Sequence, residues 1–429
     1  MFTTIYLFFY IDNTGFILYS IKAMKKQLCI IVLFFSLAVL VVGCNRSGGI
    51  AILEKKEIFT LEYGNFENQL NIFDISTVND MKTTLIMRNG FFYVMNAEAL
   101  KIMEMSSYGD LITFYYNPQY NKAPVYAGSE NVKAATRRAV EYEFNELSAI
   151  TVDSRKYLYA VDKFPFDRQD QDSENGQVLS QIVLRFNSEG KYMDYIGQQG
   201  PGGMPFPYIK SIYATNDNEL VVITYSNENY TVFWFSSDGY LLYKMPIYKQ
   251  NVPSPFEKED ASKNWHSISS IVPDYNDRSL YLKIDYYSSF IDEASHLQSG
   301  ITFNGSYIYS LNIEDGKFGE PLEILPYTEQ RSEGFSNERY EIPYDFLGVT
   351  ENGWFFFFIN TDSGFNIQMI QRDGQRILKR NLPVNRKDIL YYSLDLSNSG
   401  ILSVLFIKND KAEINWWRTD ALIQSVLKN

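Results

Sequence analysis

An all-β repeat fold is predicted by three features of this 429-residue sequence. First, residues 147–244 contain the same unit of roughly 50 to 60 residues twice in succession. Second, each unit holds four short runs rich in β-branched and aromatic residues, separated by turn-forming residues, as in a four-stranded meander. Third, one such sheet cannot bury both of its faces, whereas sheets stacked around an axis can. We therefore predict a six-bladed β-propeller, with a seven-bladed ring as the alternative.

Two kinds of turn alternate along the chain and set the number of blades. Both are rich in Asn, Asp and Gly, which tolerate or favour positive φ. The turn before the second strand recurs at residues 88–90, 153–156, 216–218, 276–278, 351–353 and 397–400. The turn before the fourth strand recurs at residues 108–110, 189–190, 238–239, 315–316, 373–374 and 419–420. The spacing of the copies varies from roughly 45 to 80 residues, so we expect insertions between fixed strands.

The N-terminal residues predict a lipoprotein signal. Residues 1–23 contain no useful signal, and we interpret them as a wrongly assigned extension, with translation starting at Met24. Residues 24–43 combine two lysines, an apolar run of about 15 residues and small residues before Cys44, and so form a signal peptide. This end resembles a bacterial lipobox, which implies cleavage before Cys44 and attachment of lipid to its thiol. An uncleaved membrane helix is the alternative, but the run is short for one.

Residues 44–55 are predicted to be a tether, and residues 56–429 the propeller domain. Residues 56–62 read as a single strand ahead of the first blade. We expect this strand to complete the last blade and close the ring, although residues 421–427 are an alternative source of that outer strand.

The six blades follow in order. They are predicted within residues 82–116, 150–196, 212–247, 269–324, 346–382 and 391–418. A loop at residues 288–303, which contains His296, is expected to interrupt the fourth blade. The run that starts at Trp354 lacks period-two alternation, which is expected of a strand covered on both faces.

Composition excludes several classes of partner. The formal net charge of −12 argues against nucleic acid, which is bound through clustered Lys and Arg. The only cysteines are Cys29, inside the signal peptide, and Cys44, so no disulfide or metal–thiolate site is expected in the mature chain. Residues 167–176 are acidic but fail the EF-hand pattern at two positions. We predict no metal and no cofactor.

Charged candidates for a site are scattered. Lys133, Arg137 and Arg138 form either an anion site or a solvated connector. His266 and His296 lie in different connectors, so neither a metal cluster nor a Ser-His-Asp arrangement is indicated. Four acids, Asp153, Asp162, Asp274 and Asp395, fall near first or second strands, where propeller chemistry usually lies; we interpret them mainly as caps of turns.

Two resemblances sharpen the fold and the location. The glycines of residues 195–212, followed by Phe206, resemble the blade junction of NHL-repeat propellers. From the lipobox onward the chain resembles a family of spirochaete lipoproteins that are predicted to form propellers. The residues that carry this likeness lie at 135–140, 144–146, 185–190 and 203–207. That family implies no activity that could be transferred to this chain.

These features predict a lipid-anchored protein of the bacterial cell envelope, bound to the inner or outer membrane through Cys44. The predicted function is a non-catalytic scaffold that binds a protein or a glycan. The alternative is a periplasmic hydrolase or a calcium-dependent lactonase with carboxylates at the propeller axis.

Overall fold

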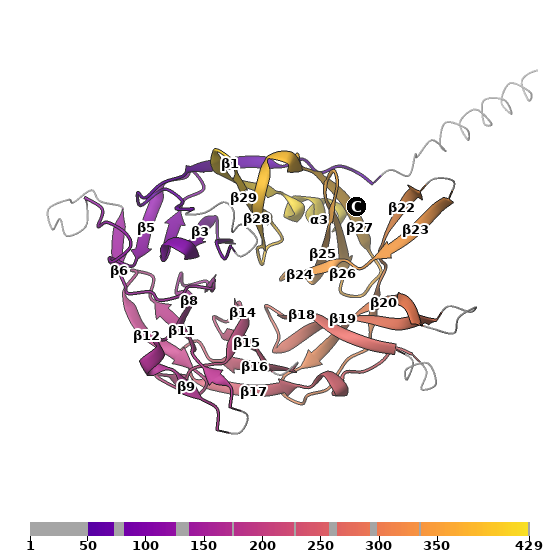
Figure 1. Cartoon of the computed structure of the whole chain (residues 1–429), viewed down its shortest axis with the longest axis horizontal. Helices are drawn as coiled ribbons and strands as arrows, with labels where there is room; N and C mark the ends of the chain where they lie inside the picture. Colours follow the sequence, from indigo (N-terminus) through magenta and orange to yellow (C-terminus); the bar gives the residue numbers. More distant parts are fainter. Residues whose placement is uncertain are drawn as a thin grey trace, which may run out of the picture. The chain divides into compact units, whose positions relative to one another are not determined.

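The computed structural model describes residues 50–72, 81–125, 137–173, 176–226, 229–256, 264–291, 298–333 and 336–427. Cys44 and the predicted signal peptide lie outside these residues, as do Lys133 and His296. Residues Ile52–Asn429 form one compact unit. In it, six mainly antiparallel sheets are arranged as a ring (Figure 1), so the predicted six-bladed β-propeller is confirmed.

Each blade is a meander of four strands. Blade 1 contains β2 (Thr84–Arg88), β3 (Phe91–Asn96), β4 (Lys101–Met105) and β5 (Leu111–Tyr116), with β6 (Arg138–Glu141) added parallel to β5. Blade 2 contains β7 (Ala149–Val152), β8 (Leu158–Lys163), β11 (Gln181–Phe186) and β12 (Tyr192–Gly197), with β13 (Gly200–Pro201) added at its edge. Blade 3 contains β14 (Tyr208–Ala214), β15 (Leu220–Ser226), β16 (Asn229–Phe235) and β17 (Leu241–Ile247).

The second half of the ring repeats this order. Blade 4 contains β18 (Asn264–Pro273), β19 (Ser279–Ile291), β20 (Gln298–Asn312) and β21 (Leu322–Ile324). Blade 5 contains β24 (Asp345–Val349), β25 (Trp354–Thr361), β26 (Gly364–Gln371) and β27 (Ile377–Pro383). Blade 6 contains β28 (Ile389–Leu396), β29 (Leu402–Lys408) and β30 (Lys411–Trp417).

The remaining elements are connectors. They are the hairpins β9 (Asp170–Gln171) with β10 (Val178–Leu179) and β22 (Tyr327–Glu333) with β23 (Ser336–Ile342), and the 3-10 turns η2 (Ala97–Ala99), η3 (Phe166–Arg168), η4 (Lys249–Asn251) and η5 (Arg386–Asp388). The chain ends in the helix α3 (Thr419–Leu427). Among the described residues, no helix has the length and apolarity needed to cross a membrane.

The ring is closed by its first strand. β1 (Lys56–Glu62) pairs antiparallel with β30 and becomes the outer strand of blade 6, as predicted (Figure 1). Residues 421–427, the alternative source of that strand, are helical instead. Blade 6 thus joins one strand from the start of the domain to three from its end, which removes an open seam.

The core lies between the blades. The described residues form six buried apolar clusters, and each cluster combines side chains of two neighbouring blades. Aromatic residues fill much of this space, and Trp354, Phe356 and Phe357 are fully buried in β25. The continuous apolar run of β25 is therefore covered on both faces, as expected.

Five of the six turns predicted before fourth strands contain a glycine with φ between 69° and 94°: Gly109, Gly190, Gly239, Gly316 and Gly374. The sixth prediction, at residues 419–420, was wrong: these residues begin helix α3, because β1 supplies the fourth strand of blade 6. At Gly239 a Cβ atom would also lie 2.6 Å from Ile196 Cδ1, so a larger residue would have to displace the Ile196 side chain in addition to adopting an unfavourable φ.

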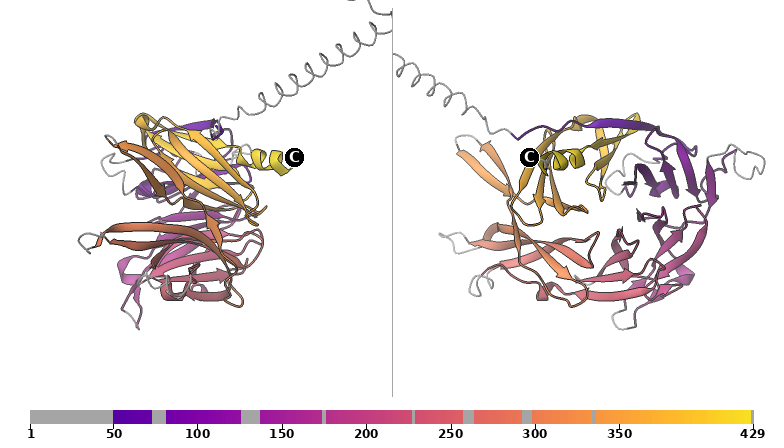
Figure 2. Two further views of the ribbon diagram at one scale, coloured as in Figure 1. Left: turned by 90° about the vertical axis from the view of Figure 1, so that its right-hand side faces the viewer. Right: turned by 180° about the vertical axis from the view of Figure 1, so that it is seen from behind.

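Blade 4 differs from the prediction. Residues 288–303 were expected to be a loop, but β19 and β20 continue as a long hairpin through most of them. This hairpin and the hairpin β22–β23 project from the ring (Figures 1 and 2). Direct pairing of the two strands, with irregularities after Tyr286 and Phe290, extends the sheet into this segment.

Candidate binding site in the axial cavity

A cavity of about 350 Å³ lies on the ring axis and is lined by residues of all six inner strands, β2, β7, β14, β18, β24 and β28. Each of these strands is the last of its sheet, so one of its edges has no strand partner. The volume lies at the lower end of the range for small-molecule sites, which is about 300–1,000 Å³. The charged and aromatic residues that line the cavity are Arg88, Lys210, Tyr213, Tyr275 and Asp395.

One end of the axis is crossed by hydrogen-bonded side chains, which we call the polar floor: Asn216, Asn276, Glu351 and Asn398. Asn216 donates to Asn276 Oδ1 at 2.8 Å, and Asn276 donates to the Glu351 carbonyl oxygen at 2.8 Å. Asn398 donates to Asn216 Oδ1 and to Glu351 Oε2, both at 3.2 Å. Because Asn216 and Asn398 belong to blades 3 and 6, on opposite sides of the ring, their bond closes this end.

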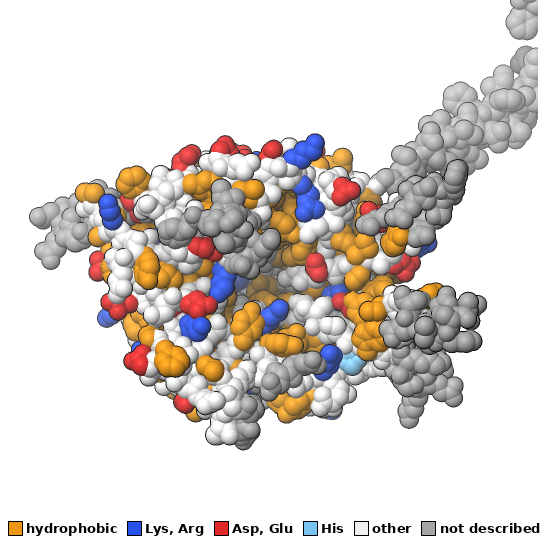
Figure 3. All heavy atoms as spheres, in the orientation of Figure 1, with side chains coloured by type: hydrophobic (Ala, Val, Ile, Leu, Met, Phe, Trp, Pro, Cys, Tyr) orange, Lys and Arg blue, Asp and Glu red, His pale blue; other side chains and the backbone are white. Residues whose placement is uncertain are grey.

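The other end of the cavity opens on the face where the inner strands begin. Helix α3 lies beside the turn after β28, since Thr419 Oγ1 donates to the Gly400 carbonyl oxygen. The view from behind shows α3 nearest the viewer (Figure 2, right), so α3 lies on the rear face of the ring as drawn in Figure 1. Figures 1 and 3 therefore show the opposite face, onto which the cavity opens. Figure 3 shows this face hollowed at its centre, with Lys and Arg side chains near the hollow.

Arg88 is the deepest cation of the cavity. It ends β2, directly before the turn at Asn89, and only 7% of it is exposed. Its guanidinium lies over the ring of Tyr275, with 5.9 Å between Cζ and the ring centroid. Its Nε has no hydrogen-bond partner, and the side chain forms no ion pair with any residue that the structure describes. A buried, unpaired guanidinium is costly unless something else binds it.

Asp395 is the acid of the cavity. It lies on β28, the neighbour of β2 in the ring, and its Oδ2 accepts the Met87 backbone N–H at 2.8 Å. Burial raises the pKa of Asp395 to about 7, while the Met87 hydrogen bond and the charge of Arg88 act in the opposite direction. The carboxyl is therefore partly protonated near neutral pH, and it does not fully cancel the charge of Arg88.

The remaining polar groups leave the cavity with an excess of positive charge. Lys210 is exposed on β14 and forms no ion pair with any described residue. Burial raises the pKa of both Tyr213 and Tyr275, so both phenols stay neutral. Two cations thus face one partly protonated carboxyl inside a protein whose net charge is −12, an arrangement that concentrates anions.

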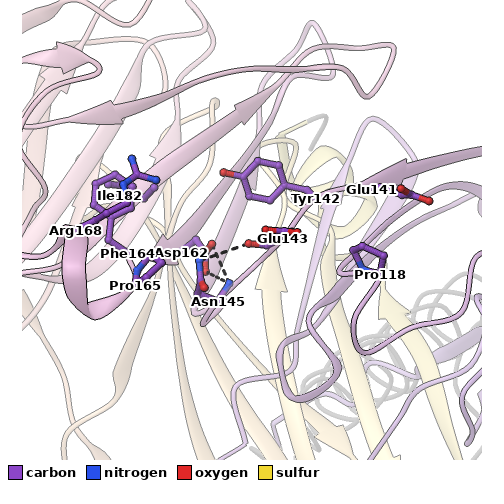
Figure 4. A pocket seen from close by; sticks show the side chains of 10 residues that line it. All are labelled: Pro118, Glu141, Tyr142, Glu143, Asn145, Asp162, Phe164, Pro165, Arg168 and Ile182. Atoms are coloured by element: carbon purple, nitrogen blue, oxygen red, sulfur yellow. Dashed lines mark hydrogen bonds between the residues drawn. The ribbon is translucent and has the colours of Figure 1, made fainter.

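A second hollow of about 480 Å³ lies between blades 1 and 2 (Figure 4). Its buried acid, Asp162, accepts the backbone N–H groups of Asn145 and Glu146 at 2.7 to 3.1 Å. Burial raises the pKa of Asp162, and these hydrogen bonds lower it. The carboxylate is occupied in holding the chain around residue 145, so we assign it a structural role.

Two further acids singled out in the sequence also cap turns. Asp153 Oδ1 accepts the N–H groups of Arg155 and Tyr157, both at 2.9 Å. Asp274 Oδ1 accepts those of Asn276 and Asp277, at 2.7 and 3.1 Å. Of the four acids, the structure places only Asp395 in the axial cavity.

Arg138 and His266 have structural partners, whereas Lys133 and His296 lie outside the described residues. Arg138 donates to the Ser188 carbonyl oxygen at 2.8 Å and lies 3.6 Å from Glu104, so it joins blades 1 and 2 and does not form an anion site. His266 Nε2 lies 2.7 Å from the Lys249 carbonyl oxygen. Among the described residues, no group of three or more His, Cys, Asp and Glu side chains is placed to hold a metal ion.

Sequence reasoning missed Arg88, Lys210 and Tyr275. In the sequence, Arg88 was noted only as part of the predicted turn at residues 88–90. One signal was present, because period-two alternation places Thr84, Ile86 and Arg88 on the same face of β2, and all three line the cavity.

No family model and no curated protein matches this sequence. Solved structures do resemble it. A streptogramin B lyase is 13% identical over 79% of this chain and 93% of its own, with a TM-score of 0.33. An ulvan lyase, a polysaccharide lyase, is 10% identical over 84% and 95%, with a TM-score of 0.40. The β-propeller domain of the trilobed protease from Pyrococcus furiosus is 10% identical over 78% and 95%, with a TM-score of 0.38. At this level the likeness concerns the fold, and we transfer no residue role from it.

Proposed function

We propose that this chain is a non-catalytic binding propeller, tethered to the bacterial cell envelope by lipid on Cys44, and that its axial cavity binds an anionic group of a protein or glycan ligand. The observation that carries the binding proposal is Arg88, which is 7% exposed, lines the cavity and has no anionic partner among the described residues.

Arg88 is suited to a carboxylate. A guanidinium presents parallel N–H donors that match the two oxygens of a carboxylate, and such charge-assisted pairs are among the strongest hydrogen bonds in proteins. The Tyr275 ring behind it supports the guanidinium plane. Lys210, exposed at the cavity, adds a second positive charge for an approaching anion.

The residues that line the cavity do not match the site of a glycosidase or of a calcium-dependent lactonase. A glycosidase of the usual kind needs a pair of carboxyl groups, and a calcium-dependent lactonase needs several oxygen ligands. Asp395 is the single acid among the residues that line the cavity. Glu351 lies in the polar floor, where its Oε2 accepts a hydrogen bond from Asn398.

Calorimetry with small probes tests the binding proposal. The full chain in detergent is titrated with acetate and glucuronate, and with glucose as the uncharged counterpart of glucuronate. We expect binding of at least one carboxylate, none of glucose, and a loss of about tenfold or more in affinity in Arg88→Gln. Lys317→Gln is a suitable control, because Lys317 is exposed and its one ion pair among the described residues is with Asp315. Binding that survives Arg88→Gln, or no binding of either acid, contradicts the proposal.

A further inference from the structure

We infer that the ligand is the free C-terminus of a polypeptide, whose last residues enter the axial cavity so that the terminal carboxylate meets Arg88. This inference rests on the proposed function and deepens it by naming the ligand class.

The cavity has one entrance. The polar floor closes the end at which the inner strands finish, through the bond between Asn216 and Asn398 across the ring. Arg88, the last residue of β2, lies toward that closed end, whereas Thr84, the first residue, lies toward the open face. A ligand group that reaches Arg88 must therefore be the end of a chain or a small molecule, since nothing can pass through the ring.

The volume is too large for an anion alone. About 350 Å³ is enclosed by the six inner strands, and polar side chains such as Thr84, Thr151 and Ser211 are among the residues that line it. A single carboxylate, phosphate or sulfate would fill only a small part of this space.

The free edges of the inner strands favour a peptide over a sugar. Each inner strand is the last of its sheet, and a peptide end presents backbone N–H and C=O groups that can pair with such an edge. On β2 that edge is already occupied by side chains of β28, because Asp395 and Ser393 accept the N–H groups of Met87 and Leu85. The Ile209 N–H of β14 and the Ile271 carbonyl oxygen of β18 are likewise bonded to the side chains of Gln181 and Tyr213, so the edges of β7, β24 and β28 remain for amide contacts.

The open face provides a path for the residues that precede the C-terminus. Tyr208, the first residue of β14, is 55% exposed, and an irregularity in the pairing between Ile209 and Ser211 separates it from the regular part of the strand. It borders a hollow of about 410 Å³ that is also lined by Ser148, whose buried hydroxyl has no hydrogen-bond partner among the described residues. This hollow would hold the upstream backbone.

The test is a matched pair of fluorescent peptides. One ends in Ala-Val-Leu with a free carboxylate, and the other has the same sequence with a C-terminal amide; binding to the full chain in detergent is followed by anisotropy. We expect the acid to bind at least about tenfold more tightly than the amide, because only the acid pairs with the guanidinium. Arg88→Gln should remove this difference, and Arg88→Lys should restore only part of it, since lysine lacks the planar fork.

Lys210→Gln keeps the test informative if Arg88→Gln does not fold. Lys210 is exposed, so its replacement should leave the thermal midpoint unchanged while weakening the acid peptide by several-fold, about the effect of one charge at partial exposure. Lys317→Gln should change neither quantity.

The outcomes separate the two proposals. If acetate or glucuronate binds in an Arg88-dependent way while the peptide acid and amide bind equally or not at all, the peptide inference is wrong and the proposed anion site stands. If no acid of any kind binds, both are wrong.

Discussion

Asp395 makes the stability of the propeller depend on pH. Burial raises its pKa from the ordinary value of 3.8 to about 7 in the folded protein. Between these values the folded protein holds a proton that the unfolded chain has released, so the free energy of unfolding falls as pH rises from about 4 to 7. Asp395→Asn retains a side-chain oxygen that can accept the Met87 N–H, but the asparagine side chain cannot ionise. We expect this variant to be more stable than the parent by about 1–3 kcal/mol at pH 8.

Urea denaturation at pH 5 and pH 8 measures this effect. The gain should be larger at pH 8 than at pH 5, and the exposed Asp167→Asn is the control. A variant less stable than the parent at pH 8 would contradict the assignment.

Asp395→Asn should also tighten the binding of a carboxylate at pH 8, because Arg88 and Lys210 would then face no ionised acid in the cavity wall. The other groups near the cavity do not change in this variant, since Tyr213 and Tyr275 stay neutral and Glu351 in the polar floor is unaltered.

Lys101 shows the opposite dependence. Its side chain is fully buried, and Nζ donates to the Phe66 carbonyl oxygen at 3.1 Å. Burial lowers its pKa from 10.5 to about 8. Between pH 8 and 10.5 the unfolded chain binds more protons than the folded protein, so stability rises through this window. Lys101→Met should flatten that rise and add about 1–3 kcal/mol at pH 7, where a buried charge is removed.

Denaturation of the parent and Lys101→Met at pH 7 and pH 10 tests this prediction. The difference between the two proteins should shrink at pH 10. Lys122→Met, an exposed lysine, serves as the control. An equal difference at both pH values would show that the methionine acts through packing and not through charge.

Individual residues were the least predictable level from sequence. Turn-capping acids such as Asp153 and Asp274 could be predicted because a cap is a local arrangement of neighbouring residues. The role of Arg88 depends on Tyr275 from blade 4 and Asp395 from blade 6, which only the closed ring brings close to it. No local sequence pattern predicts that these three residues lie close together.

At the level of elements, β1 carries the closure of the ring. Phe59, at its centre, is 9% exposed and packs edge-on against Phe92 of blade 1, with ring centroids 5.5 Å apart. β1 therefore joins blade 6 to blade 1 through side chains while it pairs with β30 through its backbone. Phe59→Ala should lower the free energy of unfolding by about 3–5 kcal/mol, because it leaves a cavity at this junction.

Phe66→Ala is the matched control, since Phe66 lies a few residues later and is 68% exposed. Its loss should cost little, about 0.5 kcal/mol or less. Urea denaturation followed by tryptophan fluorescence compares the variants. If the two changes cost the same, β1 would not be needed for closure.

Elements were predictable where residue chemistry and pairing agree. The turns with glycine at positive φ fixed the strand order, and the isolated strand at residues 56–62 had no other partner to pair with. The projecting hairpin of β19 and β20 was missed, because its serines and glycines favour loops while cross-strand pairing stabilises it as a sheet. The helix α3 was missed because a short apolar run does not distinguish a helix from a strand.

At the scale of the whole molecule, the six clusters between blades make the ring rigid, and rigidity lets the axis hold groups in unfavourable surroundings. Arg88 remains buried without an anion and Asp395 remains buried with a raised pKa because packing on every side fixes the strands that carry them. A preformed cavity binds its ligand without paying for ordering. This favours a binding role in which selectivity comes from the cavity and location comes from the anchor.

The anchor itself is predicted to be lipid on Cys44. In a bacterial host, the full chain should incorporate an alkyne-labelled fatty acid and sediment with membranes, because two or more acyl chains give stable attachment at about 0.8 kcal/mol for each buried methylene group. Cys44→Ala should abolish the label and release the protein from the membrane fraction, whereas Cys29→Ala, within the segment expected to be removed, should do neither. Labelling that persists in Cys44→Ala, or a peptide from upstream of Cys44 in the mass spectrum of the mature protein, would contradict the lipobox. The binding properties of the axial cavity should be the same in the released and anchored forms, since the propeller residues are identical in both.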